Sequence, residues 1–156
     1  YGMPMSHTAV ISFGRFNPPT RGHKLLVNKV TSIAELIGAI PKVYLSHTQD
    51  SKRNPLQYLS KYFLCREAFG SCVRPSEAST IIQVMQELDE DFHDVMMVVG
   101  SDRVDGMTEL LHKYNGKEYN YHSVEPFIFE GMRTSKSIGK FINKHIIRSH
   151  KYSYVK

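Results

Sequence analysis

Apolar residues follow two different periods along this chain, and the two kinds of segment alternate. Short, nearly uninterrupted apolar runs predict buried strands, and apolar residues three or four positions apart predict the helices that cover them. The runs predict strands at Thr8–Phe13, Lys42–His47, Asp94–Val99 and Tyr119–Phe129, with a short strand or loop at Ser71–Arg74. The spacing predicts helices at Gly22–Ile37, Leu56–Phe69, Ser79–Leu88, Asp102–Tyr114 and Thr134–Ile147.

The order of these elements indicates a fold class. Apolar strands that lack polar alternation are typical of a parallel sheet with both faces covered, and right-handed crossovers then place helices on each side. We therefore expect a single α/β domain over residues 1–156, with a doubly wound, mostly parallel sheet of about five strands. Ligands of such sheets bind at the carboxyl ends of the strands.

Composition agrees with a globular protein rather than a membrane or secreted one. Of the 156 residues, 41% are apolar and 22% are charged, and no apolar run approaches the length that spans a bilayer. The start shows no signal peptide; Met5 is a candidate natural start, with residues 1–4 an addition. We expect a cytoplasmic protein without membrane contact, in which Cys65 and Cys72 are reduced thiols. The oligomeric state, including a homo-oligomer, stays open.

The net charge indicates which kinds of binding partner to expect. A net charge of +5 and a pI near 9.2 favour anionic ligands, although a basic, solvated surface explains the same numbers. Lysine and arginine are scattered, with a mild excess near the C-terminus, and no nucleic-acid-binding motif occurs. No specific nucleic-acid partner is expected.

The loop after the first predicted strand, GRFNPPTRGH, carries the most informative chemistry. Gly14 permits a close approach of the backbone to a ligand, and Pro18 and Pro19 stiffen the turn. His23 then lies in the first turn of a helix, where free amides and the helix dipole attract anions. The alternative is a proline turn that only caps a helix, with His23 on the surface. The loop is neither a dinucleotide fingerprint nor a Walker loop.

Two further loops follow later strands, and by topology all three face one crevice. They are GSDR at Gly100–Arg103 and EGMRTSKSIGK at Glu130–Lys140. Asp102 is a candidate ribose or metal-water contact, or simply a helix N-cap. The polar loop at Thr48–Pro55 adds Lys52 and Arg53 as candidate phosphate or acceptor clamps, or as solvated surface charges.

These segments resemble a known superfamily. GRFNPPTRGH is similar to the G-x-F-x-P-x-[HT]-x-G-H signature of the nucleotidyltransferases that include nicotinamide-mononucleotide and phosphopantetheine adenylyltransferases and cytidylyltransferases. The matching residues are Gly14, Phe16, Pro18, Thr20, Gly22 and His23. The GRF start is similar to archaeal-type nicotinamide-mononucleotide enzymes, whereas Thr20 also suits the phosphopantetheine enzymes. The sequence as a whole, with NPL at Asn54–Leu56 and VGSDR at Val99–Arg103, looks most like the nucleotidyltransferase-like proteins encoded by large tailed phages. That resemblance implies that the protein is located in the host cytoplasm.

The resemblance implies a Rossmann-like nucleotidyltransferase fold and a defined reaction. A nucleoside monophosphate would pass from a triphosphate, favoured to be ATP with Mg²⁺, to a small phosphorylated acceptor, with release of pyrophosphate. The implied catalytic residues are His23 at the α-phosphate, Thr20 beside it, and Lys136. The implied nucleotide-binding set is Gly14, Arg15, Phe16, Gly22, His23, Gly100, Asp102, Arg103, Arg133, Thr134, Ser135 and Lys136, and no protein metal ligand is implied.

One position departs from the family pattern. Aligning Ser135 and Lys136 with the second family signature puts Ile138 where the family has a triphosphate-binding arginine. Either Arg133, Lys136 or Lys140 takes over that role, or the chain is a nucleotide-binding or structural protein that has lost turnover. The residue pattern leaves these alternatives open.

Overall fold

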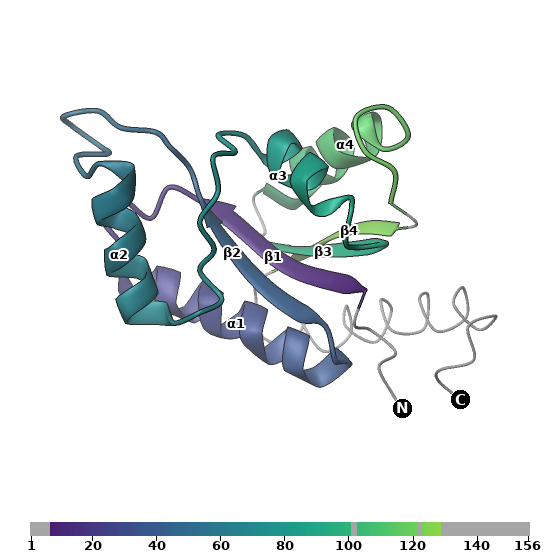
Figure 1. Cartoon of the computed structure of the whole chain (residues 1–156), viewed down its shortest axis with the longest axis horizontal. Coiled ribbons are helices and arrows are strands. Elements are labelled where there is room, and N and C mark those ends of the chain that lie inside the picture. Colours follow the sequence, from purple (N-terminus) through teal and green to yellow (C-terminus); the bar gives the residue numbers. More distant parts are fainter. Residues whose placement is uncertain (1–6, 101–102, 122, 129–156) are drawn as a thin grey trace.

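The computed structural model describes residues 7–100, 103–121 and 123–128 (Figure 1). Its strands are β1 (Thr8–Gly14), β2 (Ile40–Leu45), β3 (Asp94–Val99) and β4 (Ser123–Ile128). Its helices are α1 (Arg21–Ile37), α2 (Tyr58–Phe69), α3 (Ile81–Leu88) and α4 (Val104–Tyr114). The helix predicted at Thr134–Ile147 lies outside the described residues.

The strands form one parallel sheet in the order β2-β1-β3-β4. β1 is central, and its Val10 lies opposite Pro41 of β2 and Met96 of β3. Figure 1 shows α1 on one side of the sheet and α3 and α4 on the other. Because the strands are parallel, their carboxyl ends meet at one edge, where the chain leaves at Gly14, Leu45 and Val99.

The expected sheet of about five strands is wrong, and with it the doubly wound, Rossmann-like nucleotidyltransferase fold. The described sheet has four strands. Residues Ser71–Arg74 add only an isolated bridge between Val43 and Val73, with hydrogen bonds of 2.8 and 2.9 Å on either side of it. Gly70, at a φ of 94°, turns the chain just before the bridge, and Pro75 just after it has no amide to continue a ladder. The sheet is therefore smaller than the sequence pattern indicates.

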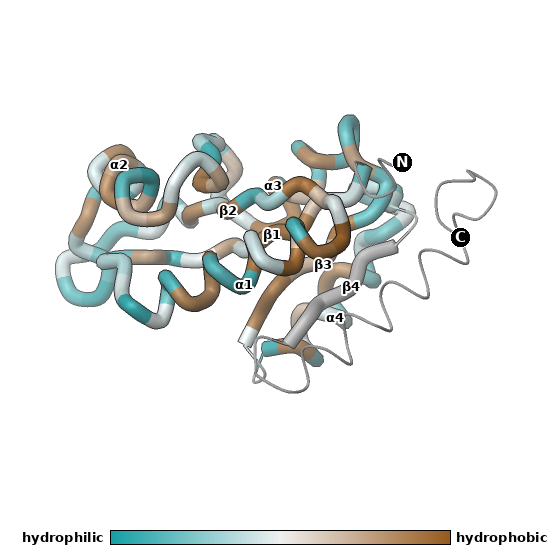
Figure 2. The backbone as a smooth tube through the Cα atoms, turned by 90° about the horizontal axis from the view of Figure 1, so that it is seen from below, coloured by the Kyte–Doolittle hydropathy of each residue, from teal (hydrophilic) through white to brown (hydrophobic). Residues whose placement is uncertain are grey.

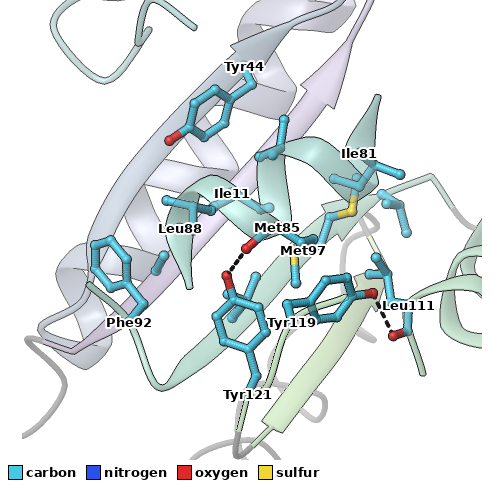
Figure 3. Packing of buried hydrophobic residues seen from close by; sticks show 14 residues of the cluster. Ile11, Tyr44, Ile81, Met85, Leu88, Phe92, Met97, Leu111, Tyr119 and Tyr121 are labelled. Atoms are coloured by element: carbon cyan, nitrogen blue, oxygen red, sulfur yellow. Dashed lines mark hydrogen bonds between the residues drawn. The ribbon is translucent and has the colours of Figure 1, made fainter. Parts of the chain in front are cut away.

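Two apolar clusters hold the layers together. The first joins α1 and Cys65 of α2 to Val10, Val43 and Met96 on one face of the sheet. The second joins α3 and Leu111 of α4 to the opposite face, as Figure 3 shows at close range. Figure 2 shows hydrophobic stretches of backbone along β1 and β3, with further ones on α2 and α3. Among the described helices, none combines the length and apolar character needed to cross a bilayer.

Two buried tyrosines fasten the second cluster. The hydroxyl of Tyr119 donates to the Leu111 carbonyl at 2.7 Å, and the hydroxyl of Tyr121 donates to the Met85 carbonyl (Figure 3). Burial raises the pKa of Tyr119 to about 12, and it raises the pKa of Tyr121 further in the same direction. Both hydroxyls therefore stay protonated and keep donating at neutral pH.

Local signals fix the ends of α1. The Thr20 side chain accepts from the His23 amide at the start, and Gly38 ends the helix in the left-handed conformation at a φ of 71°. Val27, Val30 and Ile33 are buried on one face. Burial of each such side chain contributes about 1.5–3 kcal/mol, which holds the start of α1 against the carboxyl edge of the sheet.

Candidate functional site

A cavity of about 640 Å³, here called the cradle cavity, lies at the carboxyl edge of the sheet. It is lined by Phe13, Gly14, Arg15, Phe16, His23, Leu26, Ser46, Thr48, Ser79, Ile81, Met97, Val98, Val99, Gly100, Arg103, Met107 and Leu110. Six of the predicted site residues therefore meet around one space. They are Gly14, Arg15, Phe16, His23, Gly100 and Arg103.

His23 is built into the start of α1 by a capping box in which histidine replaces the usual glutamate. The Thr20 amide donates to His23 Nδ1 at 2.9 Å, and the His23 amide donates to Thr20 Oγ1 at 3.4 Å. Because a backbone amide only donates, Nδ1 must accept, and the proton of the neutral ring lies on Nε2. Among the described residues, no group bonds Nε2, so the ring offers one donor to the cavity that it lines.

Packing fixes the orientation of that ring. Phe16 stacks on His23 with ring centroids 4.4 Å apart and an angle of 29° between the planes. Burial lowers the pKa of His23 from its ordinary value of 6.5, which favours the neutral ring at physiological pH. His23 is thus a positioned, uncharged hydrogen-bond donor.

Gly14 is required by the position of Phe16. A Cβ atom at position 14 would lie 2.9 Å from Phe16 Cε1, closer than real side chains approach. Phe16 is 1% exposed and has a positive φ of 47°, so its ring cannot easily move away. Gly14 and Phe16 therefore have a packing reason for their identity, and the result is the fixed His23 ring.

The charged side chains that line the cradle cavity are positive. Arg15 and Arg103 are exposed at the mouth, and no carboxylate lines the cavity among the described residues. Leu26, Met97 and Leu110 contribute apolar surface to the same lining. Residues 7–100, 103–121 and 123–128 contain no group of three or more His, Cys, Asp or Glu side chains that fits a metal ion. The cavity suits an anionic ligand that also carries an apolar or aromatic part.

Other predicted site residues lie elsewhere. Thr20 and Gly22 are exposed and do not line the cavity; the hydroxyl of Thr20 is used in the cap. Lys52 and Arg53 are exposed in a loop that lines neither this cavity nor the one described below. Five predicted positions fall outside the described residues: Asp102, Arg133, Thr134, Ser135 and Lys136.

Asp50 organises the loop that bears Lys52 and Arg53. Its Oδ1 accepts from the amides of Lys52, Arg53 and Asn54 at 2.9, 2.7 and 3.3 Å, and its Oδ2 accepts from Asn54 Nδ2 at 2.7 Å. These bonds, first of all the one from Arg53, lower the pKa of Asp50 to about 2. The carboxylate is therefore engaged with its own loop, and both basic side chains extend into solvent.

Asn17 was not among the predicted residues, yet it ties two loops together. Its Nδ2 donates to the Leu56 carbonyl and its Oδ1 accepts from the Leu56 amide, both at 2.9 Å and across 39 positions. Asn17 is 7% exposed, so both bonds are shielded from water. Ser46, Thr48 and Ser79 in the cavity wall also carry no local sequence signal.

A second cavity of about 780 Å³, here called the acidic cavity, borders the first. It is lined by His47, Tyr58, Leu59, Pro75, Ser76, Glu77, Ala78, Gln83 and Glu87. His47 stacks on Tyr58 with centroids 3.8 Å apart, and its Nε2 lies 2.8 Å from the Ser76 carbonyl. No residue lines both cavities, but neighbours in the chain divide between them: Ser46, Thr48 and Ser79 line the cradle cavity, and His47 and Ala78 line the acidic cavity.

Comparison with known proteins gives a match only in the C-terminal part of the chain. A family model, the KTSC domain, matches residues 111–152, which begin within α4 and contain β4. No curated protein and no solved structure gives a significant match to the chain. The matched span excludes the loop from Gly14 to His23 and every residue that lines the cradle cavity, so the match gives no information about that cavity. Over residues 111–152 the chain is similar to the KTSC domain.

Proposed function

We propose that this chain is a nucleotidyltransferase that uses the cradle cavity to bind a nucleoside triphosphate. The observation that carries the proposal is the His23 ring, whose Nδ1 accepts the Thr20 amide so that its Nε2–H is left for a ligand. Arg15 and Arg103 at the mouth and the adjoining start of α1 favour phosphate groups. The apolar wall suits a base or sugar.

The proposed reaction is an in-line displacement. A phosphate oxygen of the acceptor attacks the α-phosphorus, the bond from that phosphorus to the bridging oxygen breaks, and pyrophosphate leaves with the electron pair. Such chemistry depends mostly on positioning and on charge stabilisation. The Nε2–H of His23 would bond an α-phosphate oxygen more strongly as charge develops there. Mg²⁺ would enter with the triphosphate, because the described lining offers no carboxylate to hold it.

The roles of Arg133, Thr134, Ser135 and Lys136 at the β- and γ-phosphates stay predictions from the resemblance, as does that of Asp102. ATP is the favoured triphosphate and nicotinamide mononucleotide the favoured acceptor. Phosphopantetheine adenylyltransfer and cytidylyltransfer are the alternatives. Lys52 and Arg53, held outward by the Asp50 loop, remain candidate acceptor clamps.

One experiment tests the reaction and separates the alternatives. The full chain is incubated with Mg²⁺, each of four nucleoside triphosphates and a panel of phosphorylated acceptors, and pyrophosphate is measured. Release with one pair, lost in His23→Ala, is the expected result. Tight triphosphate binding without release from any pair would contradict an enzyme and favour a nucleotide-binding protein. Salt-sensitive binding to oligonucleotides alone would instead favour a nucleic-acid-binding protein.

A further inference from the structure

Lys61 in the first turn of α2 is the most unusual buried group near the cradle cavity. Its side chain is 0% exposed, and its Nζ donates to the Ser46 carbonyl at 2.6 Å. Across residues 7–100, 103–121 and 123–128, no carboxylate forms an ion pair with this ammonium. Lysine is almost never buried so completely without a partner of opposite charge.

The surroundings of Lys61 do not offset its charge. Burial lowers the pKa of Lys61, as expected for a cation removed from water. Cys65, one turn further along α2, is also fully buried, and burial raises the pKa of its thiol to about 11. The thiol is therefore neutral at physiological pH and supplies no negative charge. The described part of the chain leaves the ammonium without a counterion.

Contacts place this charge directly behind the cavity wall. Ser46, whose carbonyl accepts from Lys61, donates its own amide to the Gly14 carbonyl at 2.7 Å. Ser46 and Gly14 both line the cradle cavity, while Lys61 does not. Figure 1 shows α2, the helix that bears Lys61, beyond the carboxyl ends of β1 and β2. The ammonium is thus one hydrogen bond away from residues that would touch a ligand.

We propose that Lys61 is the buried countercharge of the cradle cavity. It stabilises an anionic group bound against Gly14 and Ser46. Arg15 and Arg103 approach the same ligand from the solvent side. A charge held in the interior is screened less by salt than exposed charges are, so Lys61 acts on the ligand even at high ionic strength. The inference rests on the proposed function, because it assumes that the cavity binds phosphate.

The test compares Lys61→Met with Lys117→Met, which removes the same charge from an exposed turn beyond α4. The dissociation constants of inorganic pyrophosphate and of ATP with Mg²⁺ are measured by calorimetry for the full chain at low and high salt. We expect Lys61→Met to weaken binding by about tenfold or more, and this ratio to persist at high salt. Lys117→Met should bind as the wild type does. Without ligand, Lys61→Met should unfold at an equal or higher temperature, because methionine removes an uncompensated buried charge.

A purely structural lysine predicts the reverse: a lower unfolding temperature and unchanged dissociation constants, which would overturn the inference. Lys61→Gln provides a second test, since it retains a donor for Ser46 but no charge. Wild-type binding by Lys61→Gln beside weak binding by Lys61→Met would show that the hydrogen bond acts rather than the charge, and would also overturn it. If the wild type binds neither pyrophosphate nor ATP, the proposed function fails together with this inference. If it binds both and Lys61→Met binds equally well, only the inference fails.

Discussion

The two cavities at the carboxyl edge of the sheet each contain a stacked histidine, and the two histidines differ in what they can still bind. His23 uses Nδ1 as an acceptor for the Thr20 amide, which leaves Nε2–H for a ligand. His47 has its Nε2 against the Ser76 carbonyl, so its ring proton is already used. Histidine can thus donate a hydrogen bond to a ligand in the cradle cavity, whereas in the acidic cavity it makes a hydrogen bond within the protein.

The charged groups follow the same division. The cradle cavity has Arg15 and Arg103, whereas the acidic cavity has Glu77 and Glu87, with Glu87 Oε2 bound to Ser76 Oγ at 2.5 Å. Neighbouring spaces at one sheet edge thus favour ligands of opposite charge. The comparison shows that a histidine's position at this edge does not by itself decide what it can bind. What decides it is whether the ring nitrogen that carries the proton already has a partner within the protein.

The largest expected effect separates the two histidines. His23→Ala should lower kcat/KM by about 100- to 1000-fold, the usual cost of losing one preorganised donor at a developing charge. His47→Ala, the matched control in the acidic cavity, should leave the rate close to that of the wild type. Both are measured by pyrophosphate release, with circular dichroism as the check on folding. Near-normal turnover of His23→Ala would refute the assignment of His23.

His23→Glu sharpens this result because it separates the cap from the ligand site. Glutamate is the usual residue at this position of a capping box, so the helix should remain stable. Its negative charge in the cradle cavity should abolish pyrophosphate binding through repulsion. Calorimetry and thermal unfolding measure the two properties on one sample. A loss of both stability and binding would indicate that His23 matters to the fold alone.

The next effect compares two glycines of the same loop. Gly14→Ala should destabilise the protein by about 1–3 kcal/mol, because the new Cβ displaces the Phe16 ring on which His23 stacks. Gly22→Ala has open space, with Thr20 Oγ1 the nearest atom at 3.7 Å, and should stabilise α1 by about 0.5–1 kcal/mol. Urea denaturation measures both free energies of unfolding. Equal effects of one sign would contradict the packing account.

A smaller effect distinguishes two helix caps. Thr20→Ala and Thr80→Ala each remove a hydroxyl that caps a helix, of α1 and α3 respectively, and should each cost about 1 kcal/mol. Only Thr20→Ala should also weaken pyrophosphate binding, because it loosens the box that holds His23. The free energy of unfolding and the dissociation constant of pyrophosphate are measured for both variants. Equal weakening of binding by Thr80→Ala would show that the effect is general destabilisation.

The smallest effect is on the pH dependence of stability. Burial lowers the pKa of His23 in the folded protein below its ordinary 6.5, so the unfolded chain binds the proton more readily. The contribution of the neutral ring is therefore complete above pH 6.5 and declines as the pH falls through the folded value. The stability difference between the wild type and His23→Gln should shrink from pH 7 to pH 5. A difference that grows on acidification would show the opposite pKa shift.

Local patterns predicted local features well. The apolar spacing places α1 within one residue of its observed start, because the helical period is a local property; the cap at Thr20 is seen only in the structure. Leu56 was predicted to begin the second helix, but α2 begins at Tyr58, since Leu56 bonds Asn17 from 39 positions away. The number of strands was mispredicted for a related reason, as Ser71–Arg74 has strand-like residues but only one bridged pair.

The candidate site was predicted in part. Sequence signals bring Gly14, Phe16 and His23 to notice, and the structure brings them together at one cavity. Lys61 escaped prediction because a lysine in an apolar-rich helix is normally solvated, and only the folded packing buries it. Ser46 was not predicted either, because its place in the cavity wall depends on the pairing of β2 with β1, which the local sequence does not show.

The pair of bonds between Asn17 and Leu56 makes one amide proton a reporter on the contact between two loops. Leu56 lies in a loop, where amide hydrogens normally exchange with water quickly, yet its N–H is held by a carboxamide that is 7% exposed. Its exchange should therefore report how readily the loop after β1 separates from the loop before α2. A single resolved resonance would thus follow the separation of these two loops before any substrate is known.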